Sequence, residues 1–546
     1  MASQTPSDAP LCTAPDIPHH TPHPTPPHTP HNRPALANAR AWAGLAVLAL
    51  PTFLLGLDVT LLYLALPAIA ADLQPSSTQA LWIMDIYGFL IAGFLITMGT
   101  LGDRIGRRRL LMLGAAAFSA ASVLAAFAPS ASTLIAARAA LGLAGATLMP
   151  STLALISNLF PDARQRGLAI GVWATMFALG MAAGPVVGGV LLSWFWWGAA
   201  FLAAVPVIAL LLILAPRLLP EYRADDSGPL DLFSVMLSLA AILPAIYGIK
   251  ELAKAGLAVA PLLALAAGVL CTLWFVRRQQ QLASPLLDMR LFASRTFTAA
   301  LIVLLVGLVG VSGVMLLVTQ YLQLVADLSP LAAGLWMGPP ALMMVAAGIT
   351  APLIARRIRP GFVVAGALLL STGGYLLLAR LGISPSGTLL PGLFPSDVSQ
   401  AVAGFSLVYL GLGTIAALGT DLVVGAAPPE RAGSASAMSE MVQELGVALG
   451  VALLGSLASA LYRTKMASMV TGSTGSSISS TQDALSDSLW AATGVANDLP
   501  AGALDAAREA FVQGLNTTAA VSGVCILGLA VVAAVSLRHV GTAGKA

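Results

Sequence analysis

The chain has 546 residues, of which 58% are hydrophobic and only 9% are charged. Soluble domains carry about 25% charged residues, so a water-soluble fold is excluded and a multi-pass membrane protein is expected. The net charge of +3 gives no indication of nucleic-acid binding, and the three scattered cysteines, Cys12, Cys271 and Cys525, predict neither a disulfide framework nor a metal site.

Residues 1–39 form a Pro/His/Thr-rich tail that contains five of the six histidines. Such a composition is typical of a disordered extension, with weak adventitious metal binding as the alternative. The tail lacks the apolar core of a signal peptide, so we expect it to stay on the cytoplasmic side.

Apolar segments of about 20 residues, the length of a transmembrane helix, follow one another through the rest of the chain. We predict fourteen membrane-spanning helices, near residues 43–68, 78–100, 109–128, 132–158, 167–192, 197–216, 231–250, 256–276, 297–321, 331–354, 361–380, 398–424, 433–461 and 514–538. The loop of residues 462–513 is long, contains the Gly/Ser stretch TGSTGSSISS, and ends in a segment, 504–515, that we expect to form a short external helix.

The arginines and lysines between the spans predict the orientation, because cytoplasmic loops are richer in these residues. With the N-terminus inside, the cytoplasmic loops hold Arg104, Arg107, Arg108, Arg109, Arg164, Arg166, Arg217, Arg223, Arg277, Arg278, Arg290, Arg295, Arg356, Arg357, Arg359 and Arg431. The external loops hold only Lys250, Lys254, Arg380, Arg463, Lys465 and Arg508. The even number of spans then places the C-terminus in the cytoplasm as well.

The loop between the second and third spans reads GTLGDRIGRRRLL, from Gly99 to Leu111. Its glycines permit a tight turn, and Asp103 is placed to pair with the arginines that follow. A simple positive-inside anchor is the alternative interpretation. However, the pattern resembles the loop signature of the major facilitator superfamily, and that resemblance implies a cytoplasmic gate made of Gly99, Asp103, Arg104, Gly106, Arg107 and Arg108.

The fifth span contains ALGMAAGPVVGGVLL, in which small residues recur at spacings of four. Such a face allows helices to pack closely in lipid, and the proline introduces a bend. Ordinary helix packing would explain this pattern, but the order also resembles the motif of antiporters in the same superfamily. The residues concerned are Gly180, Gly184, Pro185, Gly188 and Gly189.

A few charged side chains fall inside the spans, where charge is costly and usually functional. The acids are Asp58, Asp85, Asp421, Glu440 and Glu444, and the base is Arg138. Arg138 either snorkels to the interface or faces a polar cavity and tunes a nearby carboxylate. Glu440 and Glu444 share one helix face, and two carboxylates so close cannot both ionise cheaply, as a proton-exchange site requires. For Asp421, a surface role is an equal alternative.

Across residues 40–538 the chain resembles the fourteen-span drug:proton antiporters of the major facilitator superfamily. The stretches LDVTLLYLALP, STQALWIMDIY, MPSTLALI, WGAAFLAAVP and SEMVQELG carry this resemblance. It implies an all-α fold of two six-helix bundles joined by two extra spans, no cofactor, and alternating access in the cytoplasmic membrane. The expected domains are 40–216, a linker of 217–290 with spans seven and eight, and 291–541.

The resemblance implies efflux of small lipophilic cations in exchange for protons, by a monomer in the lipid bilayer. Asp58, Glu440, Glu444, Asp85 and Arg138 would couple proton and cation. A tentative apolar wall, whose members could equally be packing or lipid-facing residues, comprises Trp82, Tyr87, Trp173, Phe177, Met337 and Met343. The span at 331–354 lacks the acid that some relatives place there, which weighs against good handling of divalent cations.

Two other functions remain open at this stage. The same motifs would serve an exporter dedicated to one antibiotic or endogenous metabolite. A membrane sensor or intramembrane enzyme would need a nucleophile elbow, a phosphate-binding loop or a cluster of metal ligands, and no such pattern is found in the sequence. We therefore expect a transporter and not an enzyme.

Overall fold

The structure is a computed structural model that describes residues 37–223, 231–255, 258–282, 285, 287, 289–382, 396–427, 432–470, 479–500 and 502–541. This described part is helical and contains no strand. It includes fourteen helical segments long and apolar enough to cross a membrane, which confirms the predicted number of spans. Most of the predicted tail, residues 1–36, and most of the Gly/Ser stretch, residues 471–478, lie outside the described residues.

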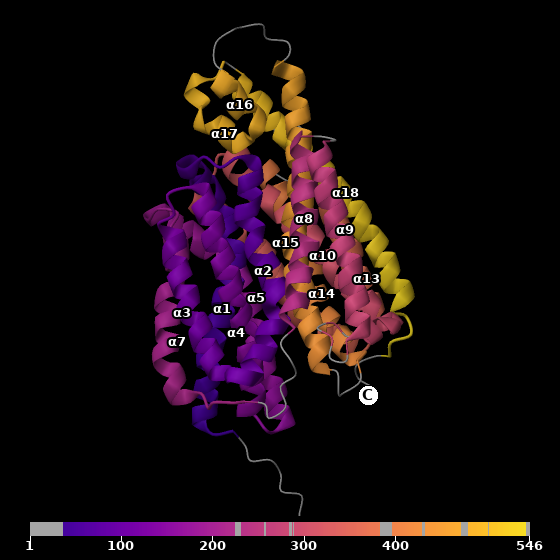
Figure 1. The fold of residues 1–546 in the computed structure, drawn as a ribbon. Helices are drawn as coiled ribbons and strands as arrows, with labels where there is room; N and C mark the ends of the chain where they lie inside the picture. Colours follow the sequence, from indigo (N-terminus) through magenta and orange to yellow (C-terminus); the bar gives the residue numbers. More distant parts are fainter. Residues whose placement is uncertain are drawn as a thin grey trace, which may run out of the picture.

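The first six spans form one bundle, in which α1 packs on α5, α2 on α4, and α3 on α4 and α7 (Figure 1). The sixth span is broken into the short α6 and the longer α7. The helices are α1 (Ala39–Leu73), α2 (Ser77–Ile105), α3 (Arg107–Ala126), α4 (Ala131–Leu159), α5 (Ala163–Trp194), α6 (Ala199–Leu202) and α7 (Ala204–Leu218).

The second bundle contains the last six spans, and α10, α14, α15 and α18 form its centre. A π-helical turn ends the ninth span, and a break at Met337 divides the tenth into α11 and α12. The elements are η1 (Met289–Ala293), α10 (Arg295–Gln320), η2 (Tyr321–Val325), α11 (Pro330–Trp336), α12 (Gly338–Ala355), α13 (Pro360–Leu378), α14 (Asp397–Gly425), α15 (Ala432–Val470) and α18 (Ala503–Ser536).

The two extra spans form a hairpin of α8 (Leu232–Ala255) and α9 (Val259–Gln281). α8 packs against α2 of the first bundle and α15 of the second, so it lies along the seam where these helices meet (Figure 1). α9 packs on α8 and leaves many large apolar side chains exposed, as expected for a helix that faces lipid.

The segment between the last two spans is more helical than the predicted loop of 462–513. α15 continues to Val470, and α18 begins at Ala503, so the expected short helix at 504–515 is the first part of the last span. Between them lie α16 (Ser479–Asp487), α17 (Leu489–Gly494) and η5 (Ala496–Asp498), at the upper end of the molecule in Figure 1. The Asp487 carboxylate accepts a hydrogen bond of 2.9 Å from the Ser77 N–H at the start of α2.

Local sequence signals explain where several helices begin. Ser76, Ser130 and Ser396 each cap the next helix, and each forms a reciprocal capping box with the residue three positions on. Between α2 and α3, Gly106 has a φ of 111°, a backbone conformation that glycine adopts without steric cost.

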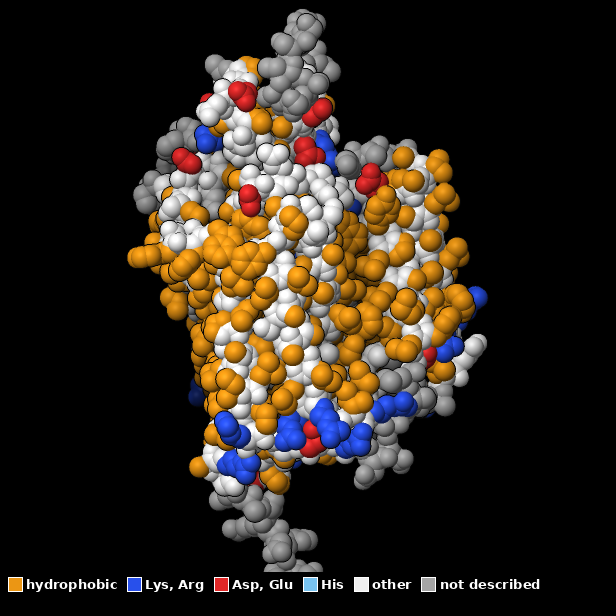
Figure 2. All heavy atoms as spheres, turned by 60° about the vertical axis from the view of Figure 1, so that its left-hand side comes forward, with side chains coloured by type: hydrophobic (Ala, Val, Ile, Leu, Met, Phe, Trp, Pro, Cys, Tyr) orange, Lys and Arg blue, Asp and Glu red, His pale blue; other side chains and the backbone are white. Residues whose placement is uncertain are grey.

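The surface is divided as the sequence predicts for a membrane protein. Figure 2 shows hydrophobic side chains over the middle of the molecule and a gathering of Lys and Arg at the end opposite α16 and α17. A basic end of this kind is typical of a cytoplasmic face.

Candidate functional site

A narrow cavity lies where α1, α2 and α4 of the first bundle meet α15 of the second. Most of the residues that line it are apolar, and a few carry charged or phenolic side chains. The lining residues are Val59, Tyr63, Met84, Asp85, Tyr87, Gly88, Arg138, Glu444, Val447, Ala448 and Val451. Gly88 allows the two bundles to approach here, because a Cβ at this position would lie 3.1 Å from the Cβ of Ala448.

Asp58 and Arg138 form an ion pair beside this cavity. Nη1 of Arg138 donates to Oδ2 of Asp58 over 2.8 Å, and its Nε donates to the carbonyl oxygen of Ile83 over 3.1 Å. The guanidinium carbon lies 4.5 Å from the centre of the Tyr87 ring, a cation–π contact. The Arg138 side chain is only 2% exposed, so it faces the cavity and does not snorkel to the interface.

Asp85 forms a second ion pair, with Lys250 of the linking hairpin. Nζ of Lys250 lies 2.9 Å from Oδ1 and 2.8 Å from Oδ2 of Asp85, and both side chains are fully buried. The same ammonium lies 3.8 Å from the centre of the Trp82 ring. The prediction that Lys250 belongs to an external loop is therefore wrong, because α8 continues past it to Ala255.

The presence of Asp85 inside an apolar span is the sequence signal that points to a buried basic partner such as Lys250. A counter-charge stabilises an ionised acid inside an apolar span, and Lys250 follows directly on the apolar run of the seventh span. Which base supplies that charge depends on how α8 packs, and no local pattern encodes this packing.

Glu444 and Glu440 lie on one face of α15, one helical turn apart. Glu444 is buried and lines the cavity, whereas Glu440 is half-buried and is not among the lining residues. Within the described part of the chain, neither carboxylate has an ion-pair partner, unlike Asp58 and Asp85. Asp421 is exposed near the end of α14 and is not among the residues that line the cavity.

Only Tyr87 of the predicted apolar wall lines this cavity. Trp82 instead packs on Phe89 and Lys250, and Trp173 is buried and donates a hydrogen bond of 3.0 Å to Thr152. The remaining predicted members, none of which is a lining residue, are Phe177 (half-buried), Met337 (buried) and Met343 (37% exposed).

The small residues of the fifth span hold α5 against two helices. Added Cβ atoms at Gly180, Gly184 and Gly188 would meet α1, and one at Gly189 would lie 2.7 Å from the Pro330 carbonyl oxygen of α11. The Pro185 carbonyl in turn faces Gly334 of α11. The motif therefore joins helices within the first bundle and also joins the two bundles, which close packing of small residues makes possible.

The loop at Gly99–Leu111 is tied to its own bundle. Nη2 of Arg107 lies 2.6 Å from Oδ1 of Asp103, and its Nη1 donates to the carbonyl oxygen of Pro150. Arg108 pairs with Glu221, and the Arg223 guanidinium donates to the Arg104 carbonyl oxygen over 2.7 Å. The segment after α7 thus contacts the loop that the sequence predicts to be a gate, through Glu221 and Arg223.

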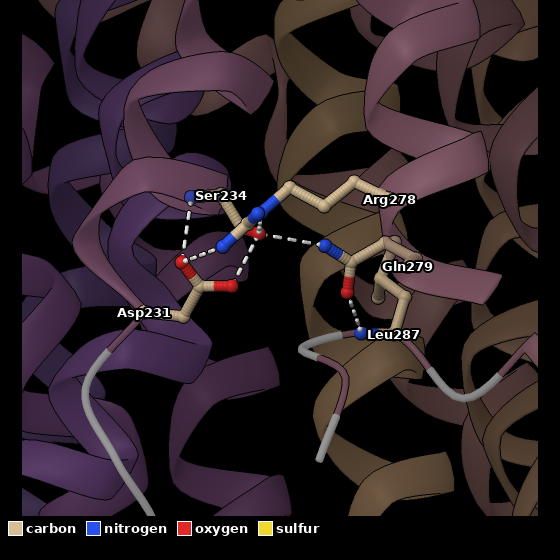
Figure 3. A network of polar contacts seen from close by, with 5 residues as sticks. All are labelled: Asp231, Ser234, Arg278, Gln279 and Leu287. Carbon is tan, nitrogen blue, oxygen red and sulfur yellow. Dashed lines mark hydrogen bonds and ion pairs between the residues drawn. The ribbon is translucent and has the colours of Figure 1, made fainter. Parts of the chain in front are cut away.

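Where α8 begins and α9 ends, a polar network joins the two helices of the hairpin (Figure 3). Asp231 accepts hydrogen bonds from the Ser234 N–H and from Arg278, both at 3.0 Å, and Gln279 accepts one from the Leu287 N–H. Burial alone would raise the pKa of Asp231, but the hydrogen bonds from Ser234 and Arg278 hold this pKa below its usual value.

Two helical bundles with a cavity of ionisable side chains between them are typical of membrane transporters. Residues 48–451 match the model of the Major Facilitator Superfamily, and the chain belongs to this family of transporters.

Among similar proteins is the multidrug efflux pump LfrA of Mycolicibacterium smegmatis, which is 42% identical over 92% of this chain and 97% of its own length. The methyl viologen resistance protein SmvA of Salmonella typhimurium is 35% identical over 90% of this chain and 97% of its own. The puromycin resistance protein pur8 of Streptomyces alboniger is 33% identical over 77% of this chain and 82% of its own.

Solved structures agree on the fold. A bacterial homologue of the human lysosomal transporter Spinster, in its inward-facing and unoccupied conformation, superposes with a TM-score of 0.64. The match covers 92% of this chain and 98% of that one at 16% sequence identity. A likeness at this level of identity concerns the fold alone.

Proposed function

We propose that this protein exports lipophilic cationic drugs, dyes and quaternary ammonium compounds in exchange for protons. The observation that carries the proposal is the cavity between the bundles, which Glu444 of α15 lines together with Asp85 of α2 and Arg138 of α4. The similarity to a multidrug efflux pump and to a methyl viologen resistance protein supports the same class of substrate.

In the proposed mechanism, a cation enters from the cytoplasm or the inner leaflet and is held by apolar contacts and by a deprotonated carboxylate. The bundles then rearrange around the cavity, and a proton from outside displaces the cation. Proton and cation compete for one negative charge, so that their exchange is coupled. Protonation also removes the cost of returning an empty charged site through a low-dielectric environment.

We assign the exchange to Asp58 and Glu444, with Glu440 and Asp85 as further acids. Arg138 tunes the proton affinity of Asp58, to which it is hydrogen-bonded at 2.8 Å. Asp103 and the arginines around it serve as the inner latch, and Gly184 and Pro185 shape the pivot of α5. The protein would work as a monomer in the cytoplasmic membrane with both termini inside, an orientation that the basic end of the molecule supports.

Ethidium efflux from energised vesicles, measured with and without a protonophore, tests the proposal. We expect efflux by the wild type, its collapse on addition of the protonophore, and loss of efflux in Asp58→Asn without loss of membrane insertion. Wild-type rates in the Asn variant would refute the role of Asp58, and efflux that persists in the protonophore would refute proton coupling.

An exporter of a single antibiotic is the second candidate, and the similarity to a puromycin resistance protein favours it. Proteoliposomes containing the purified protein distinguish the two candidates. Transport of several unrelated cations supports multidrug export, whereas transport of one compound only would establish the dedicated exporter.

A further inference from the structure

The linking hairpin places a positive charge behind one wall of the cavity, although the hairpin belongs to neither bundle. Lys250 is the residue concerned, and its ammonium bridges both oxygens of Asp85 at 2.8 and 2.9 Å. Asp85 lines the cavity, and Lys250 lies behind it, outside the set of lining residues. A substrate in the cavity would thus meet a carboxylate that already holds a cation.

The surroundings of Lys250 keep it in this place. Its ammonium lies over the Trp82 ring, and one turn earlier on α8 Ile246 packs in a small apolar cluster. That cluster unites α2, α8 and α15 through Phe89, Ile246, Ala448 and Ala452. Because both partners of the ion pair are fully buried, water screens their attraction only weakly.

The acids at the cavity differ in whether they have a basic partner. Arg138 balances Asp58, and Lys250 balances Asp85, so that each of these two acids has its own base. Glu444 on α15 is the lining acid without an ion-pair partner in the described part of the chain. Removal of Lys250 would therefore leave a second lining carboxylate without a counter-charge.

We propose that Lys250 is a specificity-determining residue that occupies the cation position on Asp85 and so favours substrates with one positive charge over those with two. This inference rests on the proposed function. Its basis is the position of the Lys250 ammonium on the Asp85 carboxylate, which lines the cavity. The two extra spans would then take a direct part in selecting the substrate.

The direction of the effect follows from electrostatics. When the charge of the site changes by one unit, the electrostatic part of the binding free energy changes twice as much for a dication as for a monocation. At a separation of about 10 Å and an effective dielectric constant near 20, one charge–charge term corresponds to a change in affinity of roughly tenfold or more. We therefore expect the ratio of dication to monocation affinity to change about tenfold when Lys250 or Asp85 is neutralised.

The test uses ethidium as the singly charged probe and methyl viologen as the doubly charged one. Binding to the purified protein and efflux from proteoliposomes are both measured, for the wild type, Lys250→Met, Asp85→Asn and the double variant. Lys250→Met should raise the methyl viologen to ethidium ratio about tenfold, and Asp85→Asn, which leaves the ammonium unpaired, should lower it by a similar factor. The double variant should return to the wild-type ratio.

Arg277→Met is the matched control, because it removes a positive charge from an exposed position on the same hairpin. It should leave the ratio unchanged. The proposal is overturned if the single variants keep the wild-type ratio, or if the double variant keeps the ratio of either single variant. Because Asp85 is also a proposed exchange acid, the ratio of binding affinities decides the matter if the double variant exports no ethidium. If one single variant does not fold, the opposite shift in the other, together with the double variant, still decides the matter.

Failure of the proposed function has a different signature. A wild type that binds both probes but exports neither refutes proton-coupled efflux, while the ratio of binding affinities still reports on Lys250. A wild type that binds neither probe overturns both proposals.

Discussion

In the first bundle Asp58 is bonded to Arg138, and Asp85 to the Lys250 that the hairpin supplies. In the second bundle, Glu440 and Glu444 lie on α15 without an ion-pair partner among the described residues. Breaking a buried pair leaves an uncompensated charge, whereas an unpaired buried acid is already free to take up a proton. The comparison separates acids that must break an ion pair before they exchange from acids that can take up a proton without losing a partner.

The largest effect is expected when the base of the first pair is removed. Arg138→Met leaves Asp58 without its partner and should cost about 3–5 kcal/mol of stability, with loss of efflux. The melting temperature in detergent measures the change. The double variant Asp58→Asn/Arg138→Met should recover most of the stability but no transport. If Arg138→Met alone were as stable as the wild type, the ion pair would have no structural role and the comparison would fail.

Glu444→Gln should behave in the opposite way. Because Glu444 has no ion-pair partner to lose, the variant should be as stable as the wild type or more so. Ethidium efflux should fall by about 10²-fold, a reduction at the lower end of what loss of a proton-transfer group causes. A variant that melts several degrees lower would instead reveal a structural role for Glu444. Glu440→Gln, one turn away and outside the lining residues, is the matched comparison and should be the milder of the two.

Gly184→Ala tests whether the close packing of α5 on α1 is needed to hold Asp58 in place beside Arg138. The added Cβ would collide with the Thr60 side chain on α1, two residues beyond Asp58, and overpacking of this kind costs about 1–3 kcal/mol. Thermal stability and efflux should both fall. Gly171→Ala on the same helix is the control, because a Cβ there meets nothing within 4 Å. Equal effects of the two substitutions would show that the loss comes from helix flexibility and not from the contact with α1.

The smallest effect is expected at Asp231, a paired acid that lies outside the membrane-spanning segments. Its folded-state pKa is below the ordinary value, so its charge contributes stability that is present at neutral pH and is lost as the pH falls through that pKa. Asp231→Asn should lower stability by about 0.5–1 kcal/mol at pH 7. The difference in melting temperature between variant and wild type should shrink below about pH 4. A constant difference across this range would assign the effect to the hydrogen bond that Asp231 accepts from the Ser234 N–H at the start of α8, and not to the charge.

Much of the fold could be predicted from the sequence. Apolar length and the position of arginines indicated fourteen spans, and the structure has fourteen such segments. The bounds were less accurate at the outer end, where α15 and α18 continue beyond the apolar segments. Polar helical turns have no hydropathy signal, so the sequence predicts a helix at 504–515 but neither α16 nor α17.

The residues of the candidate site could be predicted from the sequence only in part. Asp58, Asp85, Arg138 and Glu444 were recognisable because charge in an apolar span is costly, and all four prove to lie in or beside one cavity. The contacts of Trp82, Trp173 and Met343 were not, since an aromatic or Met side chain suits a wall, a core or a lipid-facing surface equally well.

The sequence by itself determined that the protein spans the membrane fourteen times, that one end is basic, and that a few acids must have a purpose inside the bilayer. Hydropathy and charge decide these properties residue by residue, which is why they can be read locally. Only the tertiary structure decided which base meets which acid, because Arg138 and Asp58 are 80 residues apart and Lys250 and Asp85 are 165 apart. Such pairings depend on how helices from distant parts of the chain pack, and the role of Lys250 follows from that packing.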